Sequence, residues 1–167
     1  VVNAFAGDFE KAHLAGTEFL GGLCRTAVPA PVPLVLTTNN GYPLDQNIYQ
    51  AVKSMATAEI ICRPGGVIIV AAACEDGHGG EGFYRTFVGG HGARQILQDI
   101  LKVPAECTQP DQWQSQIMAR VMANHTVILV STQPPQIVRD MGLVPAATVE
   151  EAVQLADQIL GRKEPIT

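Results

Sequence analysis

One predicted helix carries the residues of this chain whose types and spacing best suit chemistry on a small ligand. The segment "GYPLDQNIYQAVKSM" (41–55) predicts a turn followed by a helix. At about 100° per residue, Gln46, Gln50, Lys53 and Thr57 fall on one side of that helix. No acidic residue stands three or four positions from Lys53. The lysine is therefore either an ordinary solvated side chain or a cation that binds the carboxylate or phosphate of a ligand.

Histidine and cysteine side chains do not form a recognisable metal-binding pattern. His78 and His91 each lack a second ligand at the i, i+4 spacing of a helical metal site. His13 and His125 lie within or at the ends of predicted helices, where a structural role is the simpler interpretation. The cysteines are widely spaced in mostly apolar surroundings, without a CxxC pair: Cys24, Cys62, Cys74 and Cys107. Free thiols of this kind are typical of a reducing cytoplasm, and we expect no metal site.

A glycine-rich segment, "DGHGGE" (76–81), follows a predicted strand in the way that phosphate-binding loops do. It matches neither the GxGxxG pattern nor the Walker pattern, so it gives only weak support for phosphate binding. Two interpretations remain for its glycines: they allow the chain to turn sharply, or they let the loop line a ligand cleft.

Alternating strands and helices must position these residues. The expected strands are continuously apolar and lie at 1–7, 34–39, 67–74, 126–132 and 143–148. The expected helices lie at 8–28, 46–61, 91–101, 109–125, 134–142 and 149–161, with Asp8 and Asp45 as N-caps of the first two. This alternation predicts an α/β fold: a three-layer Rossmann-like domain with a mostly parallel sheet and helices on both faces. Ligands in such sheets bind beyond the carboxyl ends of the strands, which here lead into the loops 37–45 and 74–83.

The amino-acid composition limits the classes of protein to which this chain can belong. The chain has 167 residues, of which 47% are hydrophobic and 16% charged, so we expect one globular domain over residues 1–167. Its net charge of −5 and the lack of a basic run argue against nucleic acid as a partner. No apolar stretch approaches the roughly 20 residues of a bilayer span, so we expect no membrane association. The first residues resemble mid-strand sequence and "GRKEPIT" could begin another strand, so both ends look truncated.

Several longer segments resemble nickel-pincer lactate racemases and the related 2-hydroxy-acid racemases and epimerases. The strongest is "TTNNGYPLDQNIYQAVKSM" (37–55), and segments 4–16, 65–84 and 111–131 are similar at comparable spacing. The likeness covers nearly the whole chain but only the second, C-terminal domain of that family. It implies a partner N-terminal domain, a cleft between the two domains, and a small 2-hydroxy-acid substrate.

The resemblance also implies a cofactor and a mechanism. In that family the N-terminal domain holds the nickel pincer nucleotide (pyridinium-3-thioamide-5-thiocarboxylic acid mononucleotide), and racemisation proceeds by abstraction and return of a hydride. This chain has no matching histidine set and no lysine in the family's cofactor-attachment context, so we expect no cofactor in this segment alone. The segment by itself is expected to be inactive.

Four residues of this chain match cleft-facing positions of the family. Tyr49, Gln50 and Lys53 stand in the matching helix segment, with Lys53 expected to hold a substrate or cofactor acid group and Gln50 to form a hydrogen bond to substrate or cofactor. Trp113 matches a cleft-facing tryptophan, although the apolar residues on its helix also allow a core position. The alternative function is a non-catalytic module that binds a carboxylate or nucleotide on a Rossmann-like sheet. The oligomeric state is open.

Overall fold

The computed structural model describes residues 1–28 and 31–161, and the chain divides into two compact units. The first unit, Val1–Ala30, contains one helix, α1 (Phe9–Cys24). Asp8 caps this helix as expected, because its carboxylate accepts a hydrogen bond from the Lys11 amide at 3.1 Å. The strand expected at 1–7 does not form. The expectation of a single domain over the chain stays a prediction, and the strand expected to begin in "GRKEPIT" falls outside the described residues.

The second unit, Pro31–Thr167, contains the sheet and most of the helices. Its strands are β1 (Val32–Thr38), β2 (Cys62–Ala71), β3 (Thr126–Val130) and β4 (Val144–Ala146). Its helices are α2 (Ile48–Glu59), α3 (Glu81–Phe87), α4 (Ala93–Leu101), the short 3-10 helix η1 (Ala105–Cys107), α5 (Gln112–Asn124), α6 (Pro135–Asp140) and α7 (Val149–Leu160).

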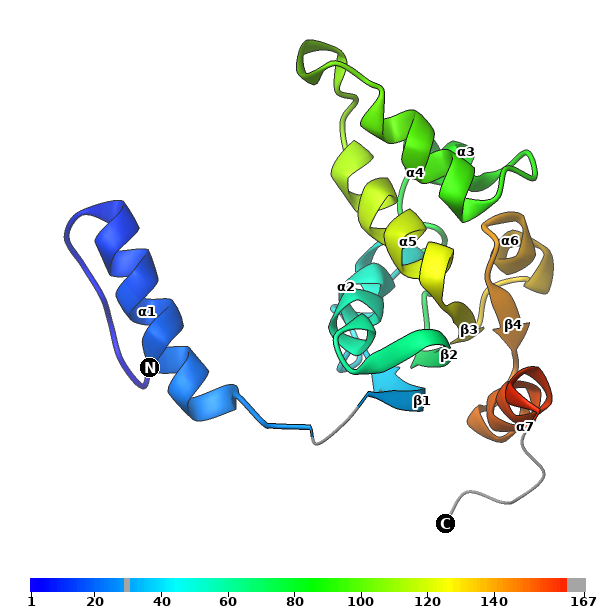
Figure 1. Cartoon of the computed structure of the whole chain (residues 1–167), viewed down its shortest axis with the longest axis horizontal. Coiled ribbons are helices and arrows are strands. Elements are labelled where there is room, and N and C mark those ends of the chain that lie inside the picture. The colour runs from blue at the N-terminus through cyan, green and yellow to red at the C-terminus, as the bar shows by residue number, and fades with distance from the viewer. Residues whose placement is uncertain (29–30, 162–167) are drawn as a thin grey trace. The chain divides into compact units, whose positions relative to one another are not determined.

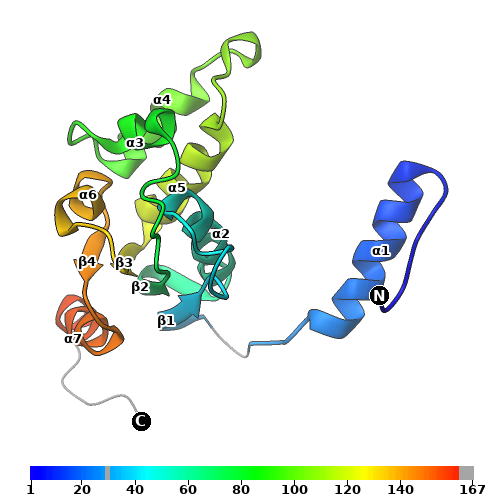
Figure 2. The same ribbon diagram turned by 180° about the vertical axis from the view of Figure 1, so that it is seen from behind.

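The four described strands form one fully parallel sheet in the order β1-β2-β3-β4. Each β-α-β connection therefore leads to the next strand in the same direction across the sheet. Because such connections share one handedness, their helices lie on the same face of the sheet. The core agrees, since side chains of α2, α3, α4, α5 and α6 pack together over one face. Helix α7 follows the last strand and packs on the opposite face, as Figures 1 and 2 show. The predicted parallel α/β fold with helices on both faces is confirmed.

Strand β2 shows why continuous apolar sequence forms a central strand. Ile68 and Val70 point into the core beneath α2 and α5, whereas Val67 and Ile69 point toward α7. All four side chains are fully buried. A strand covered on both faces has no solvent side, so the sequence shows no polar alternation.

Two local expectations are wrong. Helix α2 begins after Asn47, whose side chain accepts from the Gln50 amide at 2.9 Å, so Asp45 is not the cap. The Asp45 carboxylate instead accepts from the Ala73 amide at 3.0 Å, just beyond β2. Helix α3 begins at Glu81, inside the loop predicted at 74–83, and continues through residues that the sequence pattern left unassigned. Over the described part of the chain, no helix is both long and apolar enough to cross a bilayer.

Candidate functional site

The candidate site is a hollow at the carboxyl end of β1, on the face of the sheet that α2 covers. Its volume is about 310 Å³. The last residues of β1, the loop that follows and one side of α2 line it: Thr37, Thr38, Asn39, Asn40, Leu44, Gln50, Lys53, Ser54 and Thr57. Lys53 is the one charged side chain in this lining. A hollow with one cation among neutral hydrogen-bonding groups suits a small acid.

The structure brings Lys53 and Gln50 together. Lys53 Nζ donates a hydrogen bond to Gln50 Oε1 at 2.6 Å. No carboxylate of the described chain forms a salt bridge with this ammonium. Lys53 is exposed on the polar side of α2, while Ile48, Val52 and Met55 are fully buried on the other side. Because the apolar side of the helix packs on the sheet, the side chain of Lys53 points to solvent. Its ammonium donates one hydrogen bond to Gln50 and has further N–H groups for an acceptor from outside the chain.

Asn39 shapes the loop that closes one side of the hollow. Its side-chain amide donates to the carbonyl of Leu44 and, at 3.0 Å, to the carbonyl of Gln50. The side chain is buried, so these bonds satisfy a polar group that water cannot reach. One amide therefore joins the end of β1, the loop and the first turn of α2, which holds Gln50 at a fixed place.

The glycine-rich segment supports the start of α2. The amides of Ile48 and Tyr49 donate to the carbonyls of Gly77 and His78 at 3.1 and 3.2 Å. A Cβ at Gly79, where φ is +95°, would lie 2.5 Å from Tyr49 Cβ, so only glycine allows this close approach. These contacts show a structural role for the segment. They also occupy two of the first amides of the helix, which are therefore not available to an anion.

Tyr49 and Trp113 pack together between α2 and α5, outside the lining of the hollow. Their rings pack edge to face with centroids 6.1 Å apart, and Tyr49 also packs against Phe83 at 5.3 Å. Trp113 is 52% exposed, so the core alternative for this residue is wrong. The Tyr49 hydroxyl donates to Asp111 Oδ1 at 2.9 Å. Burial raises the pKa of Tyr49, and the hydrogen bond to Asp111 and the charge of that carboxylate raise it further.

Helix α5 holds α2 at both ends. Gln114, which is 1% exposed, donates from Nε2 to the Tyr49 carbonyl at 2.5 Å. At the other end, Arg120 forms two close contacts with Glu59 Oε2, of 2.7 Å from Nη2 and 3.1 Å from Nε. A rigid helix presents functional side chains more accurately than a loop does, so these contacts favour a defined geometry at the site.

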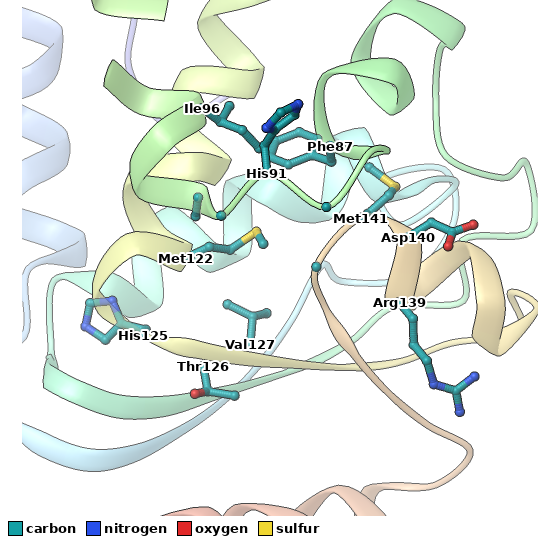
Figure 3. Close-up of a pocket in the computed structure, with 14 residues that line it drawn as sticks. Phe87, His91, Ile96, Met122, His125, Thr126, Val127, Arg139, Asp140 and Met141 are labelled. Carbon is teal, nitrogen blue, oxygen red and sulfur yellow. The ribbon is translucent and has the colours of Figure 1, made fainter. Parts of the chain in front are cut away.

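A second hollow, of about 400 Å³, lies at the amino-terminal end of β3, so it is at the opposite ends of the strands from the first hollow (Figure 3). Its buried histidine, His125, has both ring nitrogens near backbone carbonyls, 3.1 Å from Val121 O and 3.3 Å from Cys62 O. Arg139 extends away from the hollow (Figure 3). Arg139 is therefore not directed at a ligand in this hollow, and His125, whose ring nitrogens lie near backbone carbonyls, has the structural role expected.

Metal binding has no support in the part of the chain that the structure describes. These residues contain no group of three or more His, Cys, Asp or Glu side chains that could hold a metal ion. His78 Nδ1 lies within its own loop, 3.1 Å from Gly80 O, and its ring stacks on Tyr84 with centroids 4.6 Å apart. The expectation that His78 helps to form a tight turn agrees with these contacts.

Sequence reasoning missed two residues of this region. Asn39 gave a signal, because it is the last residue of the strand predicted at 34–39 and so lies at the carboxyl edge of the sheet. Asp111 gave none, because it falls within the helix predicted at 109–125. Its contact with Tyr49 joins residues 62 positions apart and cannot be read from local pattern.

Comparison with known proteins identifies relatives across the chain. The family model described as "Lactate racemase C-terminal domain" matches residues 27–167. A curated protein named "Lactate racemase" from Thermoanaerobacterium thermosaccharolyticum is 47% identical over 167 residues, which cover 99% of this chain and 39% of that protein. A second protein of that name, from Lactiplantibacillus plantarum, is 41% identical over 169 residues, which cover 100% of this chain and 39% of that protein. The chain thus spans about two fifths of the length of these relatives.

Solved structures agree. The lactate racemase apoprotein from Thermoanaerobacterium thermosaccharolyticum matches with a TM-score of 0.90 and 49% identity, over 95% of this chain and 38% of that one. A Thermotoga maritima protein matches with a TM-score of 0.54 at 15% identity, over 83% of this chain and 36% of that one. At that identity the second likeness concerns the fold alone.

Proposed function

This chain belongs to the lactate racemase C-terminal domain family, and we propose that it forms the C-terminal part of a 2-hydroxy-acid racemase or epimerase of the lactate type. The substrate would bind against the hollow at the end of β1, facing an N-terminal domain that completes the site. The names of both curated relatives support the reaction class. Their greater length supports a partner domain in the whole protein.

The observation that carries this proposal is the state of Lys53. Its ammonium has an amide partner, Gln50 Oε1 at 2.6 Å, and no salt bridge within the described chain. A lysine of this kind, at the carboxyl edge of a parallel sheet, can bind an acid group without first breaking an ion pair. A 2-hydroxy acid carries such a group at neutral pH.

Each residue then has a defined task. Lys53 binds the carboxylate of the substrate or an acid group of the cofactor. Gln50 holds the ammonium in place through Oε1 and offers its amide N–H groups to substrate or cofactor. Tyr49 and Trp113, whose rings pack edge to face, would line the cleft outside this hollow. This chain would thus fix the position of the substrate, and positioning is a large part of what a protein adds to cofactor chemistry.

The nickel pincer nucleotide is assigned to the N-terminal domain and not to this chain. No cluster of metal ligands exists among the residues described here, so they do not fit a nickel centre. Abstraction and return of the substrate hydride are what that cofactor would supply when bound. Among the residues that line the hollow, Lys53 supplies the positive charge and Gln50 the amide N–H groups suited to an acid group of such a cofactor.

A direct test uses the full-length protein with its cofactor and measures interconversion of D- and L-lactate. Lys53→Ala should lower kcat/KM by about 10- to 100-fold, the effect of losing one charge-assisted hydrogen bond to the substrate. Lys102→Ala is the matched control, because Lys102 is an exposed lysine paired with Asp99 at 3.1 Å. Equal activity of Lys53→Ala and the wild type would remove Lys53 from the mechanism. Stabilisation of the chain by a nucleotide, without racemase activity of the whole protein, would favour the alternative of a binding module.

A further inference from the structure

Helix α1 has an apolar side that the described chain leaves uncovered. At about 100° per residue, four large apolar side chains fall on one side of the helix: Phe9, Phe19, Leu20 and Leu23. The charged side chains of α1 lie on the other side: Glu10, Lys11 and Glu18. No residue of this helix is buried within the described chain. An amphipathic helix of this kind normally packs its apolar side against a partner.

The segment before α1 covers only one edge of this apolar side. Phe5 packs on Phe19 with ring centroids 5.7 Å apart, and its ring lies 3.4 Å from the position of a Cβ at Gly16. Figure 1 shows the segment folded back along the helix. Phe9 is still 86% exposed, and Leu20 is 55% exposed. The first unit therefore does not bury the apolar side of α1 by itself.

The local sequence gives α1 little stability of its own. Gly16, Gly21 and Gly22 lie within its 16 residues, and glycine disfavours a helix more than any residue except proline. Short isolated helices are marginal in water even when they lack glycine. A partner that buries the apolar side would supply the stability that the sequence of the helix does not provide.

The comparisons with known proteins indicate which partner this is. The two curated relatives match over 99% and 100% of this chain, so their likeness includes α1. The C-terminal domain family nevertheless begins at residue 27, after α1 has ended at Cys24. The chain itself divides near the same place, because the first compact unit ends at Ala30. Helix α1 is thus shared with the longer relatives but lies outside the C-terminal domain of the family.

We propose that the apolar side of α1 docks on the N-terminal domain of the full-length protein and forms part of the hydrophobic core of that domain. This inference rests on the N-terminal domain of the proposed function. The surface that receives the helix is apolar, because the α1 side chains that face it carry no charge and no hydrogen-bonding group. The C-terminal domain then begins after α1, and not at residue 1 as predicted from the sequence.

Thiol labelling of the full-length protein tests this arrangement with a matched pair of variants, Leu20→Cys and Leu14→Cys. The two leucines are similarly exposed in this chain, at 55% and 58%, but Leu14 stands one turn from Glu10 and Glu18 on the charged side. N-ethylmaleimide labelling is followed by mass spectrometry of the peptides, and each rate is compared with the rate in urea. Folding should slow labelling at position 20 by about tenfold or more and have little effect at position 14. Equal protection at the two positions would overturn the proposal.

The same samples contain two further controls. Cys74 is buried, so its lack of labelling shows that the C-terminal domain of each variant is folded. A second copy of the protein is the other partner that could cover α1. Protection of position 20 by the N-terminal domain of the same molecule should not change when the protein is diluted. Protection that disappears on dilution would assign this side of the helix to a second copy and overturn the proposal.

A stability measurement checks the proposal without a reactive label. In the full-length protein, Leu20→Ala should lower Tm by about 4 °C or more, because it removes methyl groups from a packed interface. Leu14→Ala should change Tm by no more than about 1 °C. Equal Tm values for the two variants would show that the apolar side of α1 is not packed.

These measurements do not depend on catalysis. Protection of position 20 in a full-length protein without racemase activity would overturn the proposed function and leave this inference in place. Racemase activity in a protein whose position 20 is unprotected would overturn this inference alone.

Discussion

Lys53 and Gln50 form a pair in which an amide oxygen, rather than a carboxylate, accepts from the ammonium at 2.6 Å. The two residues are three positions apart on α2 and both line the hollow at the end of β1. An amide orients the ammonium but leaves its charge uncompensated. The pair is therefore suited to bind an acid group, whereas a lysine–glutamate pair at the same positions would not be.

This pairing gives a prediction for Gln50. Gln50→Glu should place a carboxylate beside Lys53 and make it compete with the substrate, so KM for lactate should rise about 10- to 100-fold. Gln50→Ala removes the acceptor without adding charge, and its KM should rise less. Steady-state kinetics of the two variants in the full-length protein make the comparison. Similar KM values for both would show that the charge on Lys53 is not what binds the substrate.

Gly79 gives a prediction for stability. In Gly79→Ala the new Cβ would meet Tyr49 Cβ at 2.5 Å and Asn47 Oδ1 at 2.9 Å. We expect the free energy of unfolding to fall by about 2 kcal/mol or more, through overpacking and backbone strain. Gly41→Ala is the matched control, because Gly41 also has positive φ but nothing lies within 4 Å of a Cβ there. Urea unfolding of both variants measures the difference, and equal losses would mean that the close approach to Tyr49 contributes nothing.

Cys74 gives a prediction for pH dependence. Burial, and to a smaller extent the charge of Asp45, raises the pKa of this thiol from 9.0 to about 12. The unfolded thiol ionises first, so the stabilising effect is complete below pH 9.0 and is lost as the pH rises toward about 12. The free energy of unfolding should fall with rising pH in this range, by at most about 1.4 kcal/mol per pH unit from this group.

The variant Cys74→Ala should show a smaller slope against pH than the wild type, whatever its stability at neutral pH. Cys62, Tyr49 and Tyr84 also have raised pKa values, so a slope remains in the variant. Chemical unfolding at several pH values above about 8 provides the measurement. Identical slopes would show that the Cys74 thiol ionises as readily in the folded protein as in the unfolded one.

The sequence predicted the sheet and the lysine for the same reason: both depend on repeating patterns. Continuously apolar runs such as 67–74 favour strands buried on both faces, and residues 67–71 do lie in β2, which begins earlier, at Cys62. The apolar side of α2 must face the sheet, so Lys53 must point away from it. Neither inference requires knowledge of a distant contact.

Errors arose where a side chain bonds across the fold. Asp45 is a residue type that often caps helices, but its carboxylate accepts a hydrogen bond from the amide of Ala73. Asn47 caps the helix instead. The bond from Tyr49 to Asp111 is another contact across the fold, and the sequence did not predict it. Helix α3 was missed because its neighbouring glycines indicate a loop, although one of them, Gly82, lies inside the helix. The roles of such residues can be assigned only when the position of the partner strand or helix is known.

The bonds from Ile48 and Tyr49 to the carbonyls of Gly77 and His78 have a consequence for turnover. Because these two amides already donate hydrogen bonds within the chain, they are not available to an acid bound at this edge. On α2 the acid would instead contact side chains such as Lys53 and Gln50, which can rotate while the helix stays intact. Release of the acid would therefore not require the first turn of α2 to unfold.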